Sequence, residues 1–131
     1  MHLLLDTHIA VWAITDRAKL SPRAVDLLID PVHRCFVSVA SIWEIAIKNG
    51  LTRSAHADAL LPAEVALNGF TDAGFSILAI SPAHACAVEA LPPHHGDPFD
   101  RLIVAQAKLE PMRLVTHDAR LAPYSDLVFL V

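Results

Sequence analysis

Five short apolar runs, separated by stretches with helical patterning, constrain the fold of this 131-residue chain more than any other feature. Each run is four to six residues long and has polar neighbours, as strands buried on both faces of a parallel sheet do. The runs are 2–5 (HLLL), 35–39 (CFVSV), 75–80 (FSILAI), 113–116 (RLVT) and 127–131 (LVFLV). Helical patterns lie between them at about 21–30, 39–50, 62–73, 82–90 and 98–109. This alternation predicts an α/β domain with helices on both faces of the sheet.

Helix start and stop signals support this interpretation. Ser-Pro at 21–22, Ser-Pro at 81–82 and Asp-Pro at 97–98 each place a capping residue before a proline at the first helical position. Asn49-Gly50 predicts the end of the helix at 39–50, with Gly50 in the left-handed conformation. Because no internal repeat or linker interrupts the pattern, we expect one domain over residues 1–131.

Composition narrows the functional class. With 54% hydrophobic and 18% charged residues, the chain is far from the disordered class. No apolar run approaches the roughly 20 residues that span a bilayer, so no membrane attachment is expected. Cys35 and Cys86 have no CxxC spacing and suit buried thiols in a reducing cytosol better than a disulfide framework or a zinc site. The net charge of −4 gives no overall basic signal for a nucleic-acid partner.

Acidic residues from four separate segments are expected at one edge of the sheet. In parallel sheets, ligands bind beyond the carboxyl ends of the strands. Asp6 follows the first apolar run and Asp118 follows the fourth. Glu44 lies about one turn into the helix after the second run, while Asp97 and Asp100 begin the last helix. The topology therefore brings these carboxylates together.

Each acid also has a purely structural explanation, which stays open at this point. Asp6 could be a helix cap, and Asp97 with Asp100 could form a capping box. Asp118 could begin a turn, and Glu44 could form an ion pair with Lys48. Two carboxylates about 4 Å apart repel by ~4 kcal/mol at an effective dielectric near 20. Such a cluster persists if some pKa values rise or if a divalent cation lies between the carboxylates. Oxygen ligands without cysteine favour Mg²⁺, or Mn²⁺, over zinc.

The remaining polar and aromatic residues carry weaker signals. His94 and His95 are adjacent in a loop and are not expected to hold one zinc ion together. We expect Trp43 to pack in the core beside Ile47, although Trp12, Trp43 and Phe99 could in principle stack on bases. Basic residues flank the acids and are candidates for binding substrate phosphates, although each alone is better explained as solvated surface: Arg17, Lys19, Arg23, Lys48 and Arg53.

The chain resembles the PIN-domain ribonucleases, and within them the toxins of VapBC-type toxin–antitoxin pairs. The matching stretches follow the family's order and cover residues 3 to 124: LLLDTHIAVWAI, VSVASIWEIAIKNG, HHGDPFDRLIVAQA and RLVTHDARLAPY. The stretch DPFDRLIVAQA is the most specific of them. The resemblance implies a PIN-like three-layer α/β/α sandwich around a small parallel sheet.

The resemblance also implies roles for residues. Asp6, Glu44, Asp100 and Asp118 match the family's acidic quartet, with Asp6, Asp100 and Asp118 as metal ligands. Asp97, Thr7 and Thr116 match positions beside them. The implied reaction is Mg²⁺-dependent endoribonuclease cleavage that leaves a 5′-phosphate and a 3′-hydroxyl. Many relatives carry a further acid two residues after the one matched by Asp118, and this chain has Arg120 there. A strongly held second ion is therefore not expected.

The implied partners are an RNA substrate, a cognate antitoxin that covers the acids and a second copy in a homodimer. Two alternatives from other classes remain. The first is a catalytically degenerate domain that binds RNA or protein, which the complete quartet disfavours. The second is a phospho-acceptor signalling domain, which would need an aspartate after the third strand where this chain has Ser81-Pro82.

Overall fold

Five parallel strands form one sheet at the centre of the protein. The computed structural model describes residues 1–52 and 61–131. Its strands are β1 (His2–Leu5), β2 (Arg34–Ser38), β3 (Ser76–Leu78), β4 (Arg113–Thr116) and β5 (Val128–Leu130). They lie in the order β3-β2-β1-β4-β5, with all four neighbouring pairs parallel. All five predicted runs are confirmed as strands, with ends shifted by no more than two residues.

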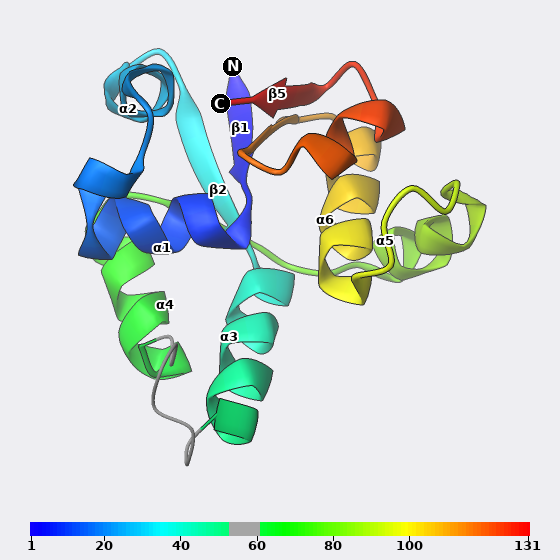
Figure 1. Ribbon diagram of the computed structural model, residues 1–131, viewed down its shortest axis with the longest axis horizontal. Coiled ribbons are helices and arrows are strands. Elements are labelled where there is room, and N and C mark those ends of the chain that lie inside the picture. Colours follow the sequence, from blue (N-terminus) through cyan, green and yellow to red (C-terminus); the bar gives the residue numbers. More distant parts are fainter. Residues whose placement is uncertain (53–60) are drawn as a thin grey trace.

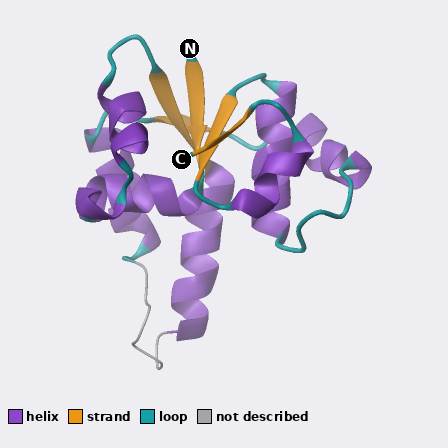
Figure 2. Ribbon diagram, turned by 45° about the horizontal axis from the view of Figure 1, so that its top comes forward, coloured by secondary structure: helices purple, strands orange, loops and turns teal. Residues whose placement is uncertain are grey.

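Helices cover both faces of this sheet, as Figures 1 and 2 show. The α-helices are α1 (Thr7–Thr15), α2 (Pro22–Ile29), α3 (Val39–Thr52), α4 (Ala63–Asp72), α5 (Pro82–Ala87) and α6 (Pro98–Leu109). Short 3-10 turns occur at η1 (Arg17–Lys19), η2 (Val88–Ala90) and η3 (Ala119–Tyr124). The predicted α/β/α sandwich around a small parallel sheet is confirmed.

Alternation along β1 divides the core into two clusters. Leu3 and Leu5 pack with α1, α2 and α4 on one face, whereas Leu4 packs with α6 and η3 on the other. Successive side chains of a strand point to opposite faces, so one buried strand supplies both clusters. At the carboxyl ends of the strands, α1 and α3 follow β1 and β2, and α6 begins nearby (Figure 1).

The helix starts were predicted well and one helix end was not. Ser21, Ser81 and Asp97 each cap a helix whose first residue is proline, as expected. However, α3 continues through Gly50 to Thr52, and among the described glycines only Gly74 has a positive φ. The Asn49 side chain donates to the Leu61 carbonyl at 2.6 Å, so it holds the returning chain and does not end the helix.

Cys35 is buried as predicted, but Cys86 is exposed, so the prediction of a buried thiol is wrong for Cys86.

The prediction that Trp43 lies in the core is wrong. Its exposed fraction is 52%, and that of Ile47 is 43%. The helix α3 buries Ser41, Glu44 and Ile45 instead, which leaves Trp43 and Ile47 on its outer side. The Trp43 ring packs edge-on against Phe99, with 4.9 Å between ring centroids.

Among the helices of the described residues, none is long and apolar enough to cross a membrane.

Candidate active site

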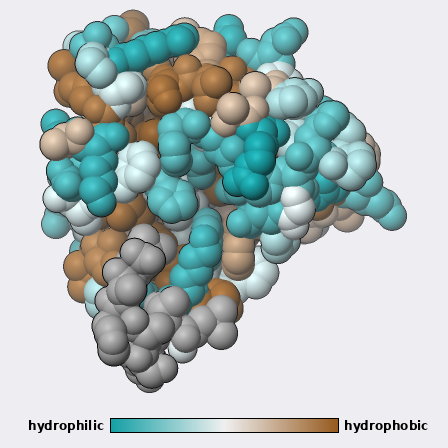
Figure 3. Space-filling view, viewed as in Figure 1, coloured by the Kyte–Doolittle hydropathy of each residue, from teal (hydrophilic) through white to brown (hydrophobic). Residues whose placement is uncertain are grey.

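The predicted acids line one cavity at the carboxyl edge of the sheet. The cavity has a volume of about 410 Å³. In the space-filling view of Figure 3, hydrophilic residues gather over the middle of the visible face. Its lining residues are Asp6, His8, Glu44, Lys48, Asp97, Asp100, His117, Asp118, Ala119 and Arg120. All five acids singled out in the sequence are therefore brought together, although they come from segments far apart in the chain.

Asp6 is held between β1 and β4. Its backbone N–H donates to the Val115 carbonyl at 2.9 Å, which continues the pairing of the two strands beyond β1. Its carboxylate accepts hydrogen bonds from Thr7 N at 2.6 Å and from Thr116 Oγ1 at 2.5 Å. The same Thr116 hydroxyl accepts from the backbone N–H of Asp118 at 3.0 Å. Thr116 thus fixes two acids relative to each other.

Glu44 is buried, so a solvated helix face does not explain it. Only 3% of the residue is exposed, and Thr7 Oγ1 donates to its Oε1 at 2.8 Å. Lys48 Nζ reaches the other oxygen at 2.5 Å, which confirms the expected i, i+4 pair. Burial disfavours the charged ammonium, but the hydrogen bond to Glu44 and the nearby carboxylates outweigh burial and raise the Lys48 pKa. Glu44 is therefore a buried carboxyl group paired with Lys48.

Asp97 is the N-cap that precedes α6, and Asp100 lies in the first turn of this helix. Asp97 Oδ1 accepts from Phe99 N at 2.8 Å and from Asp100 N at 3.3 Å, so Asp97 caps the helix. The reciprocal bond of the expected capping box does not form, because the Asp97 N–H donates to His95 Nδ1 at 3.0 Å. The Asp100 carboxylate is left to face the cavity.

The electrostatics divide the acids into two groups. Burial, followed by the repulsion of Asp6 and the other carboxylates, raises the pKa of Asp100 to about 7. Burial also raises the pKa of Asp6, although the hydrogen bond from Thr116 opposes it. In contrast, the hydrogen bond from Arg120 lowers the pKa of Asp118 to about 2. Asp6 and Asp100 are thus the two acids of the cavity whose pKa values are raised.

The carboxylate oxygens of Asp6 and Asp100 fit a hard divalent cation. Mg²⁺ and Mn²⁺ prefer oxygen ligands. A cation would stabilise the ionised form of these two carboxylates, which burial and, to a lesser extent, repulsion by neighbouring carboxylates disfavour. Among the described residues, the ligand atoms of His95, Asp100 and Asp118 also lie close enough to one another to surround one ion. The chemistry of the donor set therefore suits the expected metal.

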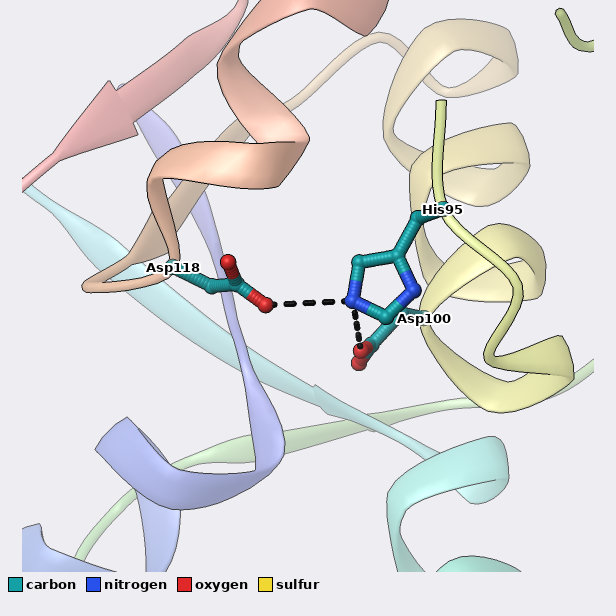
Figure 4. Close-up of side chains that lie close together, drawn as sticks. All are labelled: His95, Asp100 and Asp118. Atoms are coloured by element: carbon teal, nitrogen blue, oxygen red, sulfur yellow. Dashed lines mark hydrogen bonds and ion pairs between the residues drawn. The ribbon is translucent and has the colours of Figure 1, made fainter. Parts of the chain in front are cut away.

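Sequence reasoning missed His95 as a residue of this site. Its Nε2 lies 3.1 Å from Asp118 Oδ2 and 3.4 Å from Asp100 Oδ2, as Figure 4 shows. His95 was considered only for a zinc site shared with His94, but the His94 ring packs against Tyr124 instead. The available signal was its position two residues before Asp97, the cap of the helix that carries Asp100.

An aromatic cluster borders the same cavity. His8 and His117 line it, and the Trp12 ring lies 5.6 Å from His8 and 4.9 Å from His117 between centroids. Neither histidine was predicted as part of the site. Trp12 was named for stacking because of its type alone.

The basic residues expected to bind substrate are less concentrated than the acids. Lys48 lines the cavity, but Arg17 and Lys19 lie exposed on η1 and do not line it. Arg23 donates to the Leu130 carbonyl at 3.3 Å. Arg53 lies outside the described residues. A role for Arg17 and Lys19 in RNA binding stays a prediction.

Comparison with known proteins places this geometry in a family. The family model of the PIN domain matches residues 3–127. Two solved structures share the fold: VapBC2 from Rickettsia felis bound to a DNA fragment from its promoter, and a toxin–antitoxin complex from Klebsiella pneumoniae. Both are 20% identical to this chain. The match to the Rickettsia felis structure has a TM-score of 0.69 and covers 100% of this chain and 98% of that chain. The match to the Klebsiella pneumoniae structure has a TM-score of 0.58 and covers 98% of this chain and 99% of that chain. No curated protein matches significantly. The match to nearly the whole sequence shows that the chain belongs to the PIN domain family.

Proposed function

We propose that this protein is a Mg²⁺-dependent endoribonuclease, acting in the cytoplasm as the toxin of a toxin–antitoxin pair. The observation that carries the proposal is the pair Asp6 and Asp100, two carboxylates in one cavity whose pKa values are both raised. A chain gains nothing in stability from such an arrangement. A cation that completes the site explains why it exists.

Within this proposal, Asp6 and Asp100 would hold the cation, and Asp118 would join them once Arg120 releases it. When bound, a divalent cation neutralises charge on a scissile phosphate and lowers the pKa of a coordinated water. Glu44 is fixed by Thr7 and Lys48 and orients the attacking water from the side of α3. Asp97 keeps α6 capped and adds negative charge beside Asp100.

The cavity also contains the groups to receive an RNA backbone. Lys48 and Arg120 line the cavity, and each now neutralises one of its acids. When a cation takes over the neutralisation of Asp118, the Arg120 side chain can turn to phosphates of the substrate, while Lys48 stays on Glu44 and adds positive charge to the cavity. His8 and His117 lie on the same rim and offer rings to unpaired bases.

The proposed partners follow from the same surface and from the solved relatives, which are toxin–antitoxin complexes. An antitoxin that inserts an arginine or lysine among Asp6, Asp100 and Glu44 would neutralise them and exclude the cation. The exposed Trp43 and Ile47 offer apolar surface to such a partner, or to a second copy in a homodimer.

The decisive experiment compares the unchanged chain with Asp6→Asn in two assays, growth arrest on expression and cleavage of RNA with and without Mg²⁺. Asp26→Asn is the matched control, because Asp26 is exposed on α2 and does not line the cavity. We expect Asp6→Asn to lose both activities and Asp26→Asn to keep them. Equal growth arrest from all three chains would favour the alternative, a degenerate domain that only binds RNA or protein.

A further inference from the structure

The loop before α6 is held so firmly that it fixes the direction of the His95 ring. The His95 backbone N–H donates to the Tyr124 hydroxyl at 2.8 Å, and Arg101 Nη1 donates to the same hydroxyl at 3.1 Å. Arg101 also donates to the carbonyls of Pro92, Val88 and Leu91 at 3.0 to 3.3 Å. Only 6% of the His95 side chain is exposed. The ring therefore has a defined place between the loop and the cavity.

A backbone hydrogen bond decides which ring nitrogen of His95 carries the proton. The Asp97 N–H lies 3.0 Å from Nδ1 and can only donate, so Nδ1 must accept. In a neutral ring the proton is then on Nε2. Nε2 is the atom that faces Asp118 Oδ2 at 3.1 Å and Asp100 Oδ2 at 3.4 Å (Figure 4). The ring thus presents an N–H group to two carboxylates.

We propose that His95 is a positioning residue, a fixed hydrogen-bond donor that holds the Asp100 and Asp118 carboxylates at a spacing at which they share one divalent cation. The proposal rests on the metal-dependent function above, since it concerns the site of that cation. It assigns the cation to oxygen ligands and gives His95 no direct bond to it.

The opposite role, a nitrogen ligand, conflicts with the same backbone contact. A histidine that binds a metal through Nε2 carries its proton on Nδ1 and donates it to a carboxylate or carbonyl. Here the group facing Nδ1 is the Asp97 N–H, so two donors would point at each other. Ligation would also break the contact that links His95 to the capped end of α6.

Two variants separate the two nitrogen atoms of the ring. His95→Gln can place an amide N–H near the position of Nε2 but offers no acceptor at Nδ1. His95→Asn can accept from Asp97 N near the position of Nδ1 but leaves no donor at Nε2. Both keep the backbone contact with Tyr124, and thermal unfolding of each chain checks that it is folded. His95→Leu removes both functions.

The first measurement is the dissociation constant of Mg²⁺ for the full chain, by calorimetry without RNA. We expect His95→Gln to stay within about threefold of the unchanged chain, while His95→Asn and His95→Leu bind about tenfold or more weakly, as for other outer partners of metal ligands. Equal weakening in Gln and Asn would make His95 a ligand. If only His95→Gln bound Mg²⁺ more weakly, the function of His95 would be limited to holding the loop through Nδ1. If all three variants kept the Mg²⁺ affinity of the unchanged chain, His95 would have no role in positioning the carboxylates.

The second measurement is the tautomer itself, from long-range proton–nitrogen NMR spectra of histidine-labelled protein with and without Mg²⁺. The signal of His95 is assigned by its loss in His95→Gln. We expect a proton on Nε2 and none on Nδ1 in both states, whereas a proton on Nδ1 would overturn the donor role. This result is independent of cleavage. An unchanged chain that binds no Mg²⁺ would instead overturn the proposed metal-dependent function.

Discussion

Arg120 holds the Asp118 carboxylate with three N–H groups. Its backbone N and its Nε each donate to Oδ1 at 3.0 Å, and its Nη2 donates to Oδ2 at 3.0 Å. With His95 at 3.1 Å, all four lone-pair sites of this carboxylate are in use. Asp118 can therefore bind a cation only after Arg120 moves. The Arg120 side chain is 70% exposed, so such a pair exchanges easily with solvent.

Replacing this arginine should change metal and RNA binding in opposite directions. In Arg120→Gln, we expect Mg²⁺ to bind about two- to fivefold more tightly, because Asp118 is released from an exposed ion pair. RNA binding should weaken in the same variant, and its dependence on salt should fall by about one counterion. Calorimetry measures the first effect. A salt series with the cleavage-inactive Asp6→Asn chain measures the second.

The control is Arg34→Gln, which removes an exposed charge outside the cavity. It should change neither quantity appreciably. If Arg120→Gln weakened Mg²⁺ binding, Arg120 would be supporting the metal site and the competition inferred from its contacts with Asp118 would be wrong.

Mg²⁺ binding should strengthen as pH rises through neutrality. Without metal, the pKa of Asp100 is about 7, so below that pH the cation must displace a proton. Because one proton is displaced from Asp100, the affinity for Mg²⁺ should change by at most about tenfold per pH unit below pH 7. Above pH 7 the affinity should become nearly independent of pH. Titrations at several pH values, in buffers of different ionisation heat, give both affinity and protons released. An affinity that did not vary with pH would show that Asp100 is not a ligand.

The same carboxylate should make the metal-free protein less stable as pH rises. In the folded state its pKa is about 7, above its ordinary value of 3.8. Between these two pH values the folded state keeps a proton on Asp100 that the unfolded state has released. The stability that this proton contributes is full below pH 3.8 and is lost as pH rises to 7. Asp100→Asn should therefore raise the melting temperature at pH 8 by about 3–5 °C, the equivalent of ~1 kcal/mol. The gain should vanish near pH 4. Asp26→Asn serves again as the control, and an equal gain at both pH values would point to a cause other than charge.

The strands and the acid cluster were predictable because both follow from regular patterns. A buried parallel strand needs a short apolar run, and the carboxyl end of β1 necessarily lies beside that of β4 once the two pair. Asp6 and Asp118 were placed by that logic alone. Which acids remain ionised was not predictable, because it depends on contacts such as Thr116 to Asp6 that only the folded chain defines.

The misplaced Trp43 and the unrecognised His95 show where sequence patterns fail. On α3 the apolar side was taken as the buried side, but the cavity draws the polar residues Ser41 and Glu44 inward. His95 lies in a loop with no periodicity, and its direction is set by Tyr124 and Arg101 from other segments. Loop residues of this kind are found through tertiary contacts, which a single sequence does not display.

A buried glutamine joins the helix that carries Asp100 to the central sheet. Gln106 is fully buried; its Oε1 accepts from Ser38 Oγ at 2.5 Å and its Nε2 donates to the Ala79 carbonyl at 3.3 Å. Its Nε2 also lies 3.4 Å from His84 Nδ1. Gln106→Leu would keep the volume but remove all of these hydrogen bonds. We expect it to lower the free energy of unfolding by ~1–3 kcal/mol, the cost of buried polar groups left without partners. Urea unfolding measures this.

The matched test adds Ser38→Ala to Gln106→Leu. Because the second change removes a hydroxyl that has lost its acceptor, the double variant should be less destabilised than the sum of the two single variants. Strictly additive losses would mean that the Ser38 and Gln106 side chains contribute independently.

The hydroxyl of Thr116 reaches the Asp6 carboxylate across 110 positions of sequence. During synthesis on a ribosome, the first residues emerge long before β4 does, and until β4 emerges nothing lies beside β1 on that side. A nascent or truncated chain ending before Thr116 therefore lacks a complete cleft. The cluster that contains Asp6 and Asp118 is therefore assembled only after the chain has been synthesised through β4.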